Sequence, residues 1–154
     1  MRVLLHIVFL GTLAFAGCSP QKADSLSLSP LPFAMQIPAG ILPQLGTGPV
    51  EGPFGEQVRL AGAIAATTVY YTPVGQGDKA IFLTAYWFPA EKFDALQSPD
   101  QPPLVGTEVL RQDGKVLSVA GPLDAMFAPD TPDGQNLTAL YGVIFLPETY
   151  RAIE

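Results

Sequence analysis

The sequence predicts an α+β domain, in which a mostly antiparallel sheet of about five or six strands is covered on one face by one to three short helices. Short segments dense in β-branched and aromatic residues alternate with turn-forming clusters of Gly, Pro, Asn and Asp, which is typical of antiparallel strands. Apolar residues at helical spacing are confined to one stretch after the fourth strand and another near the C-terminus. Helices inserted among antiparallel strands in this way indicate the α+β class.

The least regular part of the domain comes first. Residues 33–38 alternate enough to predict an edge strand ended by proline. Residues 39–54 are interrupted by four glycines and three prolines, so they predict an irregular loop. Residues 56–66 leave two interpretations open, because 57–61 alternate like a strand whereas 63–66 fit a helical turn.

The next segments carry clearer signals. Residues 67–72 are β-branched and aromatic, and they stop at the turn cluster 73–78. Residues 79–88 are apolar on both faces, which predicts a central strand covered on each side. Residues 89–96 begin with a proline, which the first helical turn accepts, and carry apolar residues three apart. They predict a short helix packed on the sheet.

Asp113-Gly114 is the strongest hairpin signal in the chain. It lies between two strand-like segments, residues 107–112 and 115–119. A proline-rich loop at residues 97–104 precedes the first of these segments. Asp and Gly both tolerate the positive φ angles that a two-residue turn of this kind requires. The sequence therefore predicts a tight hairpin.

The C-terminal part leaves alternatives open. Residues 122–127 fit one helical turn, and residues 135–146 have apolar residues at helical spacing. A second helical start is indicated at 147–151. Residues 143–146 alternatively fit a closing strand.

The extreme N-terminus has the pattern of a secretion signal. Arg2 precedes an apolar stretch, residues 3–15, which is shorter than the ~20 residues that span a bilayer. The stretch closes on Phe15-Ala16-Gly17-Cys18, a small-small-Cys ending that contains the only cysteine in the chain. This ending resembles the lipobox of bacterial lipoprotein precursors, although Phe15 replaces the usual Leu. The rival interpretation is Ala14-Phe15-Ala16 as a site for ordinary signal peptidase, which would release the protein with a free thiol.

The resemblance implies that residues 1–17 are a signal peptide and that Cys18 carries a diacylglycerol, often with a further acyl chain on the new amino terminus. Such an anchor holds a protein at a membrane without a transmembrane helix. Ser19 follows the cysteine in place of the Asp that commonly signals inner-membrane retention, so the chain resembles lipoproteins sent to the periplasmic face of the outer membrane. We expect residues 18–32, which are rich in Pro and Ser, to form a tether, and residues 33–154 to form one globular domain.

Composition excludes several classes of function. From Cys18 onward the chain has seven basic and fourteen acidic residues and no basic run, so nucleic acid is not an expected partner. The only histidine, His6, lies in the signal, and lipid occupies the only cysteine. Histidine- and cysteine-based catalysis and metal binding are therefore excluded for the mature domain. We expect no catalytic residue and no cofactor other than the lipid on Cys18.

Two sets of polar residues are candidate metal or catalytic sites. The loop carrying Asp124, Asp130, Asp133 and Asn136 gathers oxygen ligands for calcium, but its spacing departs from the EF-hand pattern, and turn and cap chemistry explains it better.

Glu91, Asp94 and Glu108 are the carboxylates that could serve a glycan hydrolase, which needs two carboxyl groups roughly 5–9 Å apart. No spacing in the sequence brings two of them into one cleft, so surface charge is the better explanation.

Aromatic residues in the two strands give a third candidate set, which is Tyr70, Tyr71, Tyr86 and Trp87. Core packing is the simpler interpretation, whereas an exposed platform would stack sugars or grip a partner. The turn residues Asp113 and Gly114 complete the predicted contact residues. We expect a lipid-anchored, non-catalytic envelope domain that binds a protein. The alternatives are small-molecule or glycan binding in an aromatic cleft and, third, a carboxylate-based hydrolase.

Overall fold

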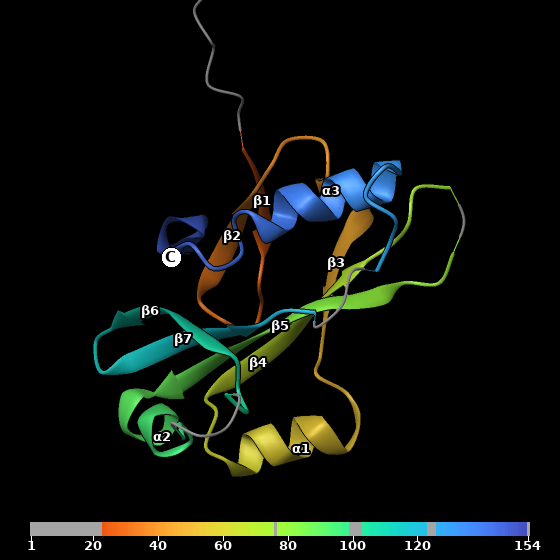
Figure 1. Cartoon of the computed structure of the whole chain (residues 1–154). Helices are drawn as coiled ribbons and strands as arrows, with labels where there is room; N and C mark the ends of the chain where they lie inside the picture. Colours follow the sequence, from red (N-terminus) through yellow and green to blue (C-terminus); the bar gives the residue numbers. More distant parts are fainter. Residues whose placement is uncertain (1–22, 76, 99–102, 123–125, 154) are drawn as a thin grey trace, which may run out of the picture.

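Eight strands form two antiparallel sheets in the computed structural model, which describes residues 23–75, 77–98, 103–122 and 126–153 (Figure 1). The smaller sheet has the order β1-β2-β8, and the larger has the order β3-β4-β5-β7-β6. The strands of the smaller sheet are β1 (Asp24–Ser27), β2 (Phe33–Ile37) and β8 (Tyr150–Ala152). Those of the larger are β3 (Leu45–Gly48), β4 (Ala65–Tyr71), β5 (Ala80–Pro89), β6 (Thr107–Gln112) and β7 (Lys115–Ala120).

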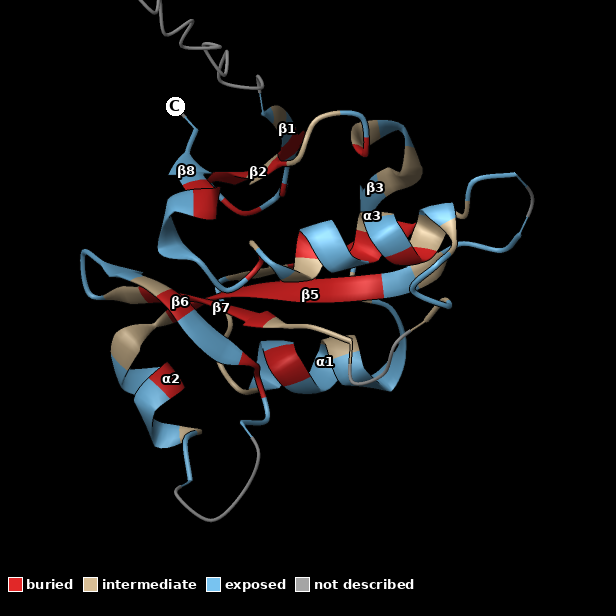
Figure 2. Cartoon of the chain, turned by 45° about the horizontal axis from the view of Figure 1, so that its top comes forward, coloured by how far each residue is buried: buried red, intermediate tan, exposed pale blue. Residues whose placement is uncertain are grey.

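Three α-helices pack on the larger sheet, and together with the antiparallel strands they confirm the α+β class. They are α1 (Gly52–Leu60), α2 (Ala90–Ala95) and α3 (Pro132–Tyr141). Helix α3 and the smaller sheet lie on one face of the larger sheet, while α1 and α2 lie on the other (Figure 2). The structure therefore differs from the prediction of one sheet with helices on one face. Helices lie on both faces of the larger sheet, and the chain also forms a second, smaller sheet.

Strand β5 divides the interior into two hydrophobic clusters. Leu83, Ala85 and Trp87 face the smaller sheet and α3, whereas Tyr86 and Phe88 face α1 and α2. Residues 82–88 are all buried. This confirms the predicted central strand and explains why its apolar residues do not alternate with polar ones.

The predicted hairpin is also confirmed. Gln112 pairs with Lys115 across the turn, and Asp113 and Gly114 have φ angles of +49° and +68°. Positive φ at both turn residues matches the strand twist, which is why Asp-Gly specifies this turn.

The expected tether is shorter than residues 18–32. Residues 24–27 form β1, which pairs with β2, and Leu28 and Leu31 are buried in the core. The fold therefore begins by Asp24. Strand β2 forms as predicted from residues 33–38, but it lies between β1 and β8 and is not an edge.

The two open interpretations of residues 56–66 are both wrong, because the helix comes first and the strand second. Pro53 stands at the start of α1, where its missing N–H costs nothing, and Gly62, with φ +96°, follows the helix end. Residues 39–54 are also more regular than expected. They contain a 3₁₀ turn, Leu42–Gln44, and the whole of β3 before α1 begins.

At the C-terminus, α3 begins three residues earlier than predicted and ends at Tyr141. The second helical start is a single 3₁₀ turn, Pro147–Thr149. The closing strand is β8 and not residues 143–146. The helical turn expected at 122–127 includes residues 123–125, which lie outside the described residues.

Candidate protein-binding surface

Most of the predicted aromatic platform is hydrophobic core. Tyr71, Tyr86 and Trp87 are buried, and Trp87 packs edge-on against Phe33 with 5.0 Å between ring centroids. Trp87 and Tyr86 lie on opposite faces of the sheet. Burial raises the pKa of Tyr86, an effect that the neighbouring Thr84 side chain partly offsets. These side chains do not come together in one cleft.

Tyr70 is the least buried of the four aromatic residues in the predicted platform. Its ring lies against Gly48 of β3, where an added Cβ would stand 3.0 Å from the ring. The ammonium group of Lys79 lies 4.2 Å from the ring centroid on the neighbouring strand end. Tyr70 therefore packs over the glycine-rich edge strand β3. Lys79 makes a cation–π contact with the same ring.

Tyr71 and Asp133 join the sheet to α3. The Tyr71 hydroxyl donates to Asp133 Oδ1 at 2.7 Å and accepts from Asn136 Nδ2 at 3.1 Å. The Val74 N–H donates to the same Asp133 oxygen at 2.8 Å. Burial, opposed by Asn136 and reinforced by Asp133, raises the pKa of Tyr71 to about 12. Asp133 and Asn136 thus serve internal hydrogen bonds.

The sequence predicts Asp133 or Asn136 as the N-cap of the C-terminal helix, but the N-cap of α3 is Thr131. Thr131 Oγ1 accepts from the Gly134 N–H at 3.0 Å at the start of α3. Among the described residues no group of three or more His, Cys, Asp or Glu side chains could hold a metal ion. Asp124, the remaining member of the predicted calcium loop, lies outside those residues.

Two of the three candidate carboxylates share an arginine on the surface. Arg111 of β6 donates to Asp94 of α2 at 2.7 Å and to Glu108 at 2.6 Å. The two carboxylates raise the pKa of Arg111, and the hydrogen bonds from Arg111 lower the pKa of Asp94. All three side chains are solvent-accessible. The cluster therefore fastens α2 to β6, and Glu91 is not part of it.

The turn residues Asp113 and Gly114 are exposed at the tip of the β6–β7 hairpin. The carbonyl oxygen of Gly114 accepts from the Ala90 N–H at 2.8 Å. This bond ties the hairpin tip to the start of α2.

A large cleft lies where the sequence predicts no site. It has a volume of about 510 Å³ and lies between α1, the beginning of β4, the end of β3 and the turn at residues 29–30. Its lining is mostly small or apolar, and Arg59 is its one charged side chain. The lining residues are Ser29, Pro30, Thr47, Gly48, Pro49, Val50, Gly55, Val58, Arg59, Ala63, Ile64, Ala65 and Ala66.

A smaller apolar groove lies on the other side of α1. It has a volume of about 170 Å³ and runs between α1 and the segment after α2, with Phe54, Leu96 and Leu104 among its lining residues. Val58 lines both hollows and is the one buried side chain of α1. The helix therefore separates two concave surfaces.

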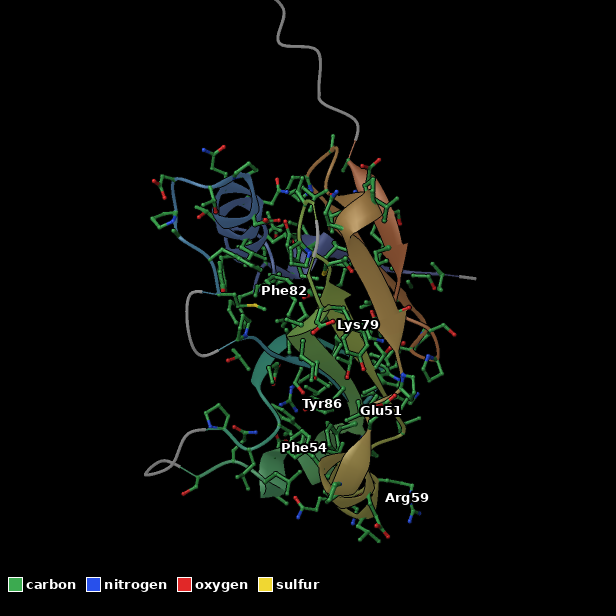
Figure 3. The ribbon with its side chains drawn as sticks, turned by 90° about the vertical axis from the view of Figure 1, so that its right-hand side faces the viewer. Glu51, Phe54, Arg59, Lys79, Phe82 and Tyr86 are labelled. Atoms are coloured by element: carbon green, nitrogen blue, oxygen red, sulfur yellow. The ribbon has the colours of Figure 1, made fainter. Side chains whose placement is uncertain are left out.

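Exposed apolar side chains gather around these hollows. Phe54 is 46% exposed, Ile64 52%, Leu104 66% and Leu60 70%. Figure 3 shows Phe54 beside Tyr86, consistent with their ring centroids 6.4 Å apart, and Arg59 on the outer side of α1. We call this region the α1 surface and define it by Phe54, Arg59, Leu60, Ile64 and Leu104 together with the two hollows.

Helix α1 lies at the end of the molecule opposite the start of β1 (Figure 1), and the turn at residues 29–30, which follows β1, lines the large cleft beside it. Figure 2 shows most of α1 coloured as exposed with one buried segment, and Val58 in that helix packs in the cluster under the sheet with Tyr86 and Phe88. Sequence reasoning missed this surface because it assigned a loop to the first turn of α1. The available signal was Pro53 followed by apolar residues at 54 and 58, a spacing that fits one face of a helix.

Comparison of the chain with protein families, with curated proteins and with solved structures gives no match. None of the helices in the described part of the chain is long and apolar enough to cross a membrane. The candidate site is therefore defined by its own geometry.

Proposed function

We propose that this protein is a lipid-anchored, non-catalytic accessory domain of the bacterial cell envelope that binds another protein through the α1 surface. The observation that carries the proposal is the gathering of exposed apolar side chains and two hollows around α1, the helix opposite the start of β1. Exposed apolar patches rimmed by polar residues are typical of protein interaction sites.

The predicted anchor favours this orientation. Cys18 precedes Asp24 by six residues, which span at most about 20 Å when fully extended. A lipid on Cys18 would hold the β1 end close to the membrane, at the periplasmic face of the outer membrane if Ser19 acts as expected. The α1 surface would then face away from the lipid, where a protein partner can reach it.

The alternatives have less support. A glycan or small-molecule cleft lined by Tyr71, Tyr86 and Trp87 would require side chains that pack in the core. A carboxylate-based hydrolase would require two carboxylates facing a substrate, whereas Asp94 and Glu108 both bind Arg111. The residues named for these two alternatives do not line the hollows of the α1 surface.

Site-specific photo-crosslinking in native membranes tests the proposal. A photoreactive phenylalanine analogue replaces Leu60 or Leu104 in the full-length protein, and Val74, which is 50% exposed and bonds to Asp133 of α3, serves as the control. We expect one recurrent protein adduct from positions 60 and 104, absent from position 74 and reduced by excess unlabelled protein. Equal adducts at all three positions, or none at 60 and 104, would contradict the proposal.

The anchor has its own test. Mass spectrometry of the mature protein should show diacylglycerol on Cys18, and Cys18→Ser should abolish both the modification and the membrane association. An unmodified protein beginning at Gly17 would instead support the rival cleavage site.

A further inference from the structure

The edge of β4 is only partly covered by β3. Gly48 pairs with Thr68, and the pairing stops there, whereas β4 continues back to Ala65. Pro49 explains the stop, because it has no N–H to give to the next rung of the ladder. The chain then turns away into α1. Residues 65–67 consequently pair with β5 on one side and with no described strand on the other. Thr67 is fully buried and its hydroxyl donates to the Gly48 carbonyl oxygen at 3.1 Å, so the open part of the edge is Ala65 and Ala66.

The free edge forms one wall of the large cleft. Ala65 and Ala66 line it and are partly exposed, and β5 supplies the only backbone partners that the described residues offer to positions 65–67. Helix α1 stands on one side of this edge and the turn at residues 29–30 on the other. A strand edge beside a helix is the geometry in which an extended peptide adds to a sheet.

We infer that the β4 edge at residues 65–66 accepts an extended segment of a partner protein as an added antiparallel strand, with a carboxylate of that segment bound by Arg59. This inference rests on the proposed function and specifies how the α1 surface binds. The free stretch of two residues is about 7 Å long, enough for about two residues of the partner. The added strand would lie beside β4, in the position in the sheet that β3 occupies up to Gly48.

The lining of the cleft selects the occupant. Gly48, Gly55, Ala65 and Ala66 give it walls with little side-chain bulk, so a backbone can approach the edge closely. Arg59 is exposed, and no acidic side chain in the described part of the chain pairs with it. An acidic segment of another protein suits both features.

Peptide selection on the full-length lipidated protein in detergent micelles tests the inference. The probe is a random dodecapeptide library displayed on phage, and recovered peptides are synthesised for measurement of affinity. We expect recovered sequences to contain an acidic residue and to protect from hydrogen exchange the amide within residues 65–66 that does not bond to β5. Methylation of alternate peptide nitrogens should abolish binding in one set of positions and leave it unchanged in the other, because only alternate amides face β4.

Charge variants test the role of Arg59. We expect Arg59→Glu to weaken the recovered acidic peptides by about fivefold. Arg151→Glu, a reversal at an exposed position on β8, is the matched control and should leave affinity unchanged.

The outcomes separate the inference from the proposed function. Peptides that protect only the apolar groove beside Phe54 and Leu104, a failure to recover any peptide, or self-association through the β4 edge would each overturn strand addition. The photo-crosslinking at positions 60 and 104 would still decide whether the α1 surface binds a protein. Adducts there without strand addition would leave the proposed function standing and refute this mode of binding.

Discussion

The hydrogen bond between Tyr71 and Asp133 allows a quantitative test of how α3 is held on the sheet. The Tyr71 hydroxyl is buried and donates to a carboxylate at 2.7 Å. Hydrogen bonds to charged groups contribute about 1.5–3 kcal/mol. Asp133 is only partly buried, so water can replace its lost donor, and we expect Tyr71→Phe to lower the free energy of unfolding by about 1.5 kcal/mol.

Asp133→Ala should cost slightly more, about 2 kcal/mol, because it leaves a buried hydroxyl without its acceptor. The double variant should cost about 2.5 kcal/mol, less than the sum of the two single changes, which gives a coupling energy of about 1 kcal/mol. The measurement is urea unfolding of the four proteins at pH 7 with a common slope. Costs that simply add, with coupling below about 0.3 kcal/mol, would refute the claim that this bond holds α3 in place.

The same pair predicts an alkaline effect. The pKa of Tyr71 is raised from 10.0 to about 12, chiefly by burial, so the folded state favours the protonated phenol. Its contribution is fully present below pH 10 and is lost as the pH rises toward 12. The advantage of the wild type over Tyr71→Phe should therefore shrink by roughly 1 kcal/mol per pH unit above pH 10. An advantage that stays constant from pH 9 to pH 11 would contradict this reasoning.

Three further predictions concern the fold and the alternatives. Leu28→Ala should lower the free energy of unfolding by about 2–5 kcal/mol because Leu28 is buried. Leu104→Ala, at an exposed leucine, should change it by less than about 0.5 kcal/mol. If urea unfolding gave similarly small losses for both variants, residues 24–31 would belong to the tether and not to the folded domain. Gly114→Ala should cost about 1–2 kcal/mol in thermal unfolding, because its φ of +68° strains any residue with a Cβ; an unchanged midpoint would argue against the two-residue turn. Trp87 fluorescence should resist acrylamide quenching and stay constant during titration with oligosaccharides, and a saturable change would revive the glycan alternative.

Local signals predicted the middle of the chain well. Residues 67–72 and 79–88 became β4 and β5 because β-branched and aromatic side chains pack on both faces of a covered sheet. Pro89 and Asp113-Gly114 act through backbone geometry alone, and the helix and hairpin that they predicted are confirmed. These elements needed no knowledge of distant contacts.

Strand β1 depends on distant contacts and was therefore missed. Its serines and the nearby prolines are typical of a tether, and its strand form depends on pairing with β2. Leu26, Leu28 and Leu31 are buried in the core, yet a short leucine spacing by itself does not distinguish a strand from a linker.

The candidate site was harder still to predict from sequence. The cleft is assembled from the turn at 29–30, the end of β3 and residues 55–66, so no contiguous segment contains it. The aromatic residues of β4 and β5 gave a wrong candidate site for a related reason. Both faces of β5 are covered, and alternation along a strand gives no indication of which face, if either, is open.

The proline positions explain both the free edge and the weakly buried helix beside it. Pro49 ends the β3 ladder before β4 is fully covered, and Pro53 starts α1 almost at once, so the chain has no residues with which to complete the edge. Helix α1 then buries only Val58, which leaves its other apolar side chains at the surface. A longer β3 would close the cleft, and a more deeply packed α1 would fill the groove beside Phe54. Both hollows therefore depend on the same short connection, and a partner that adds a strand to β4 would also contact the exposed residues of α1.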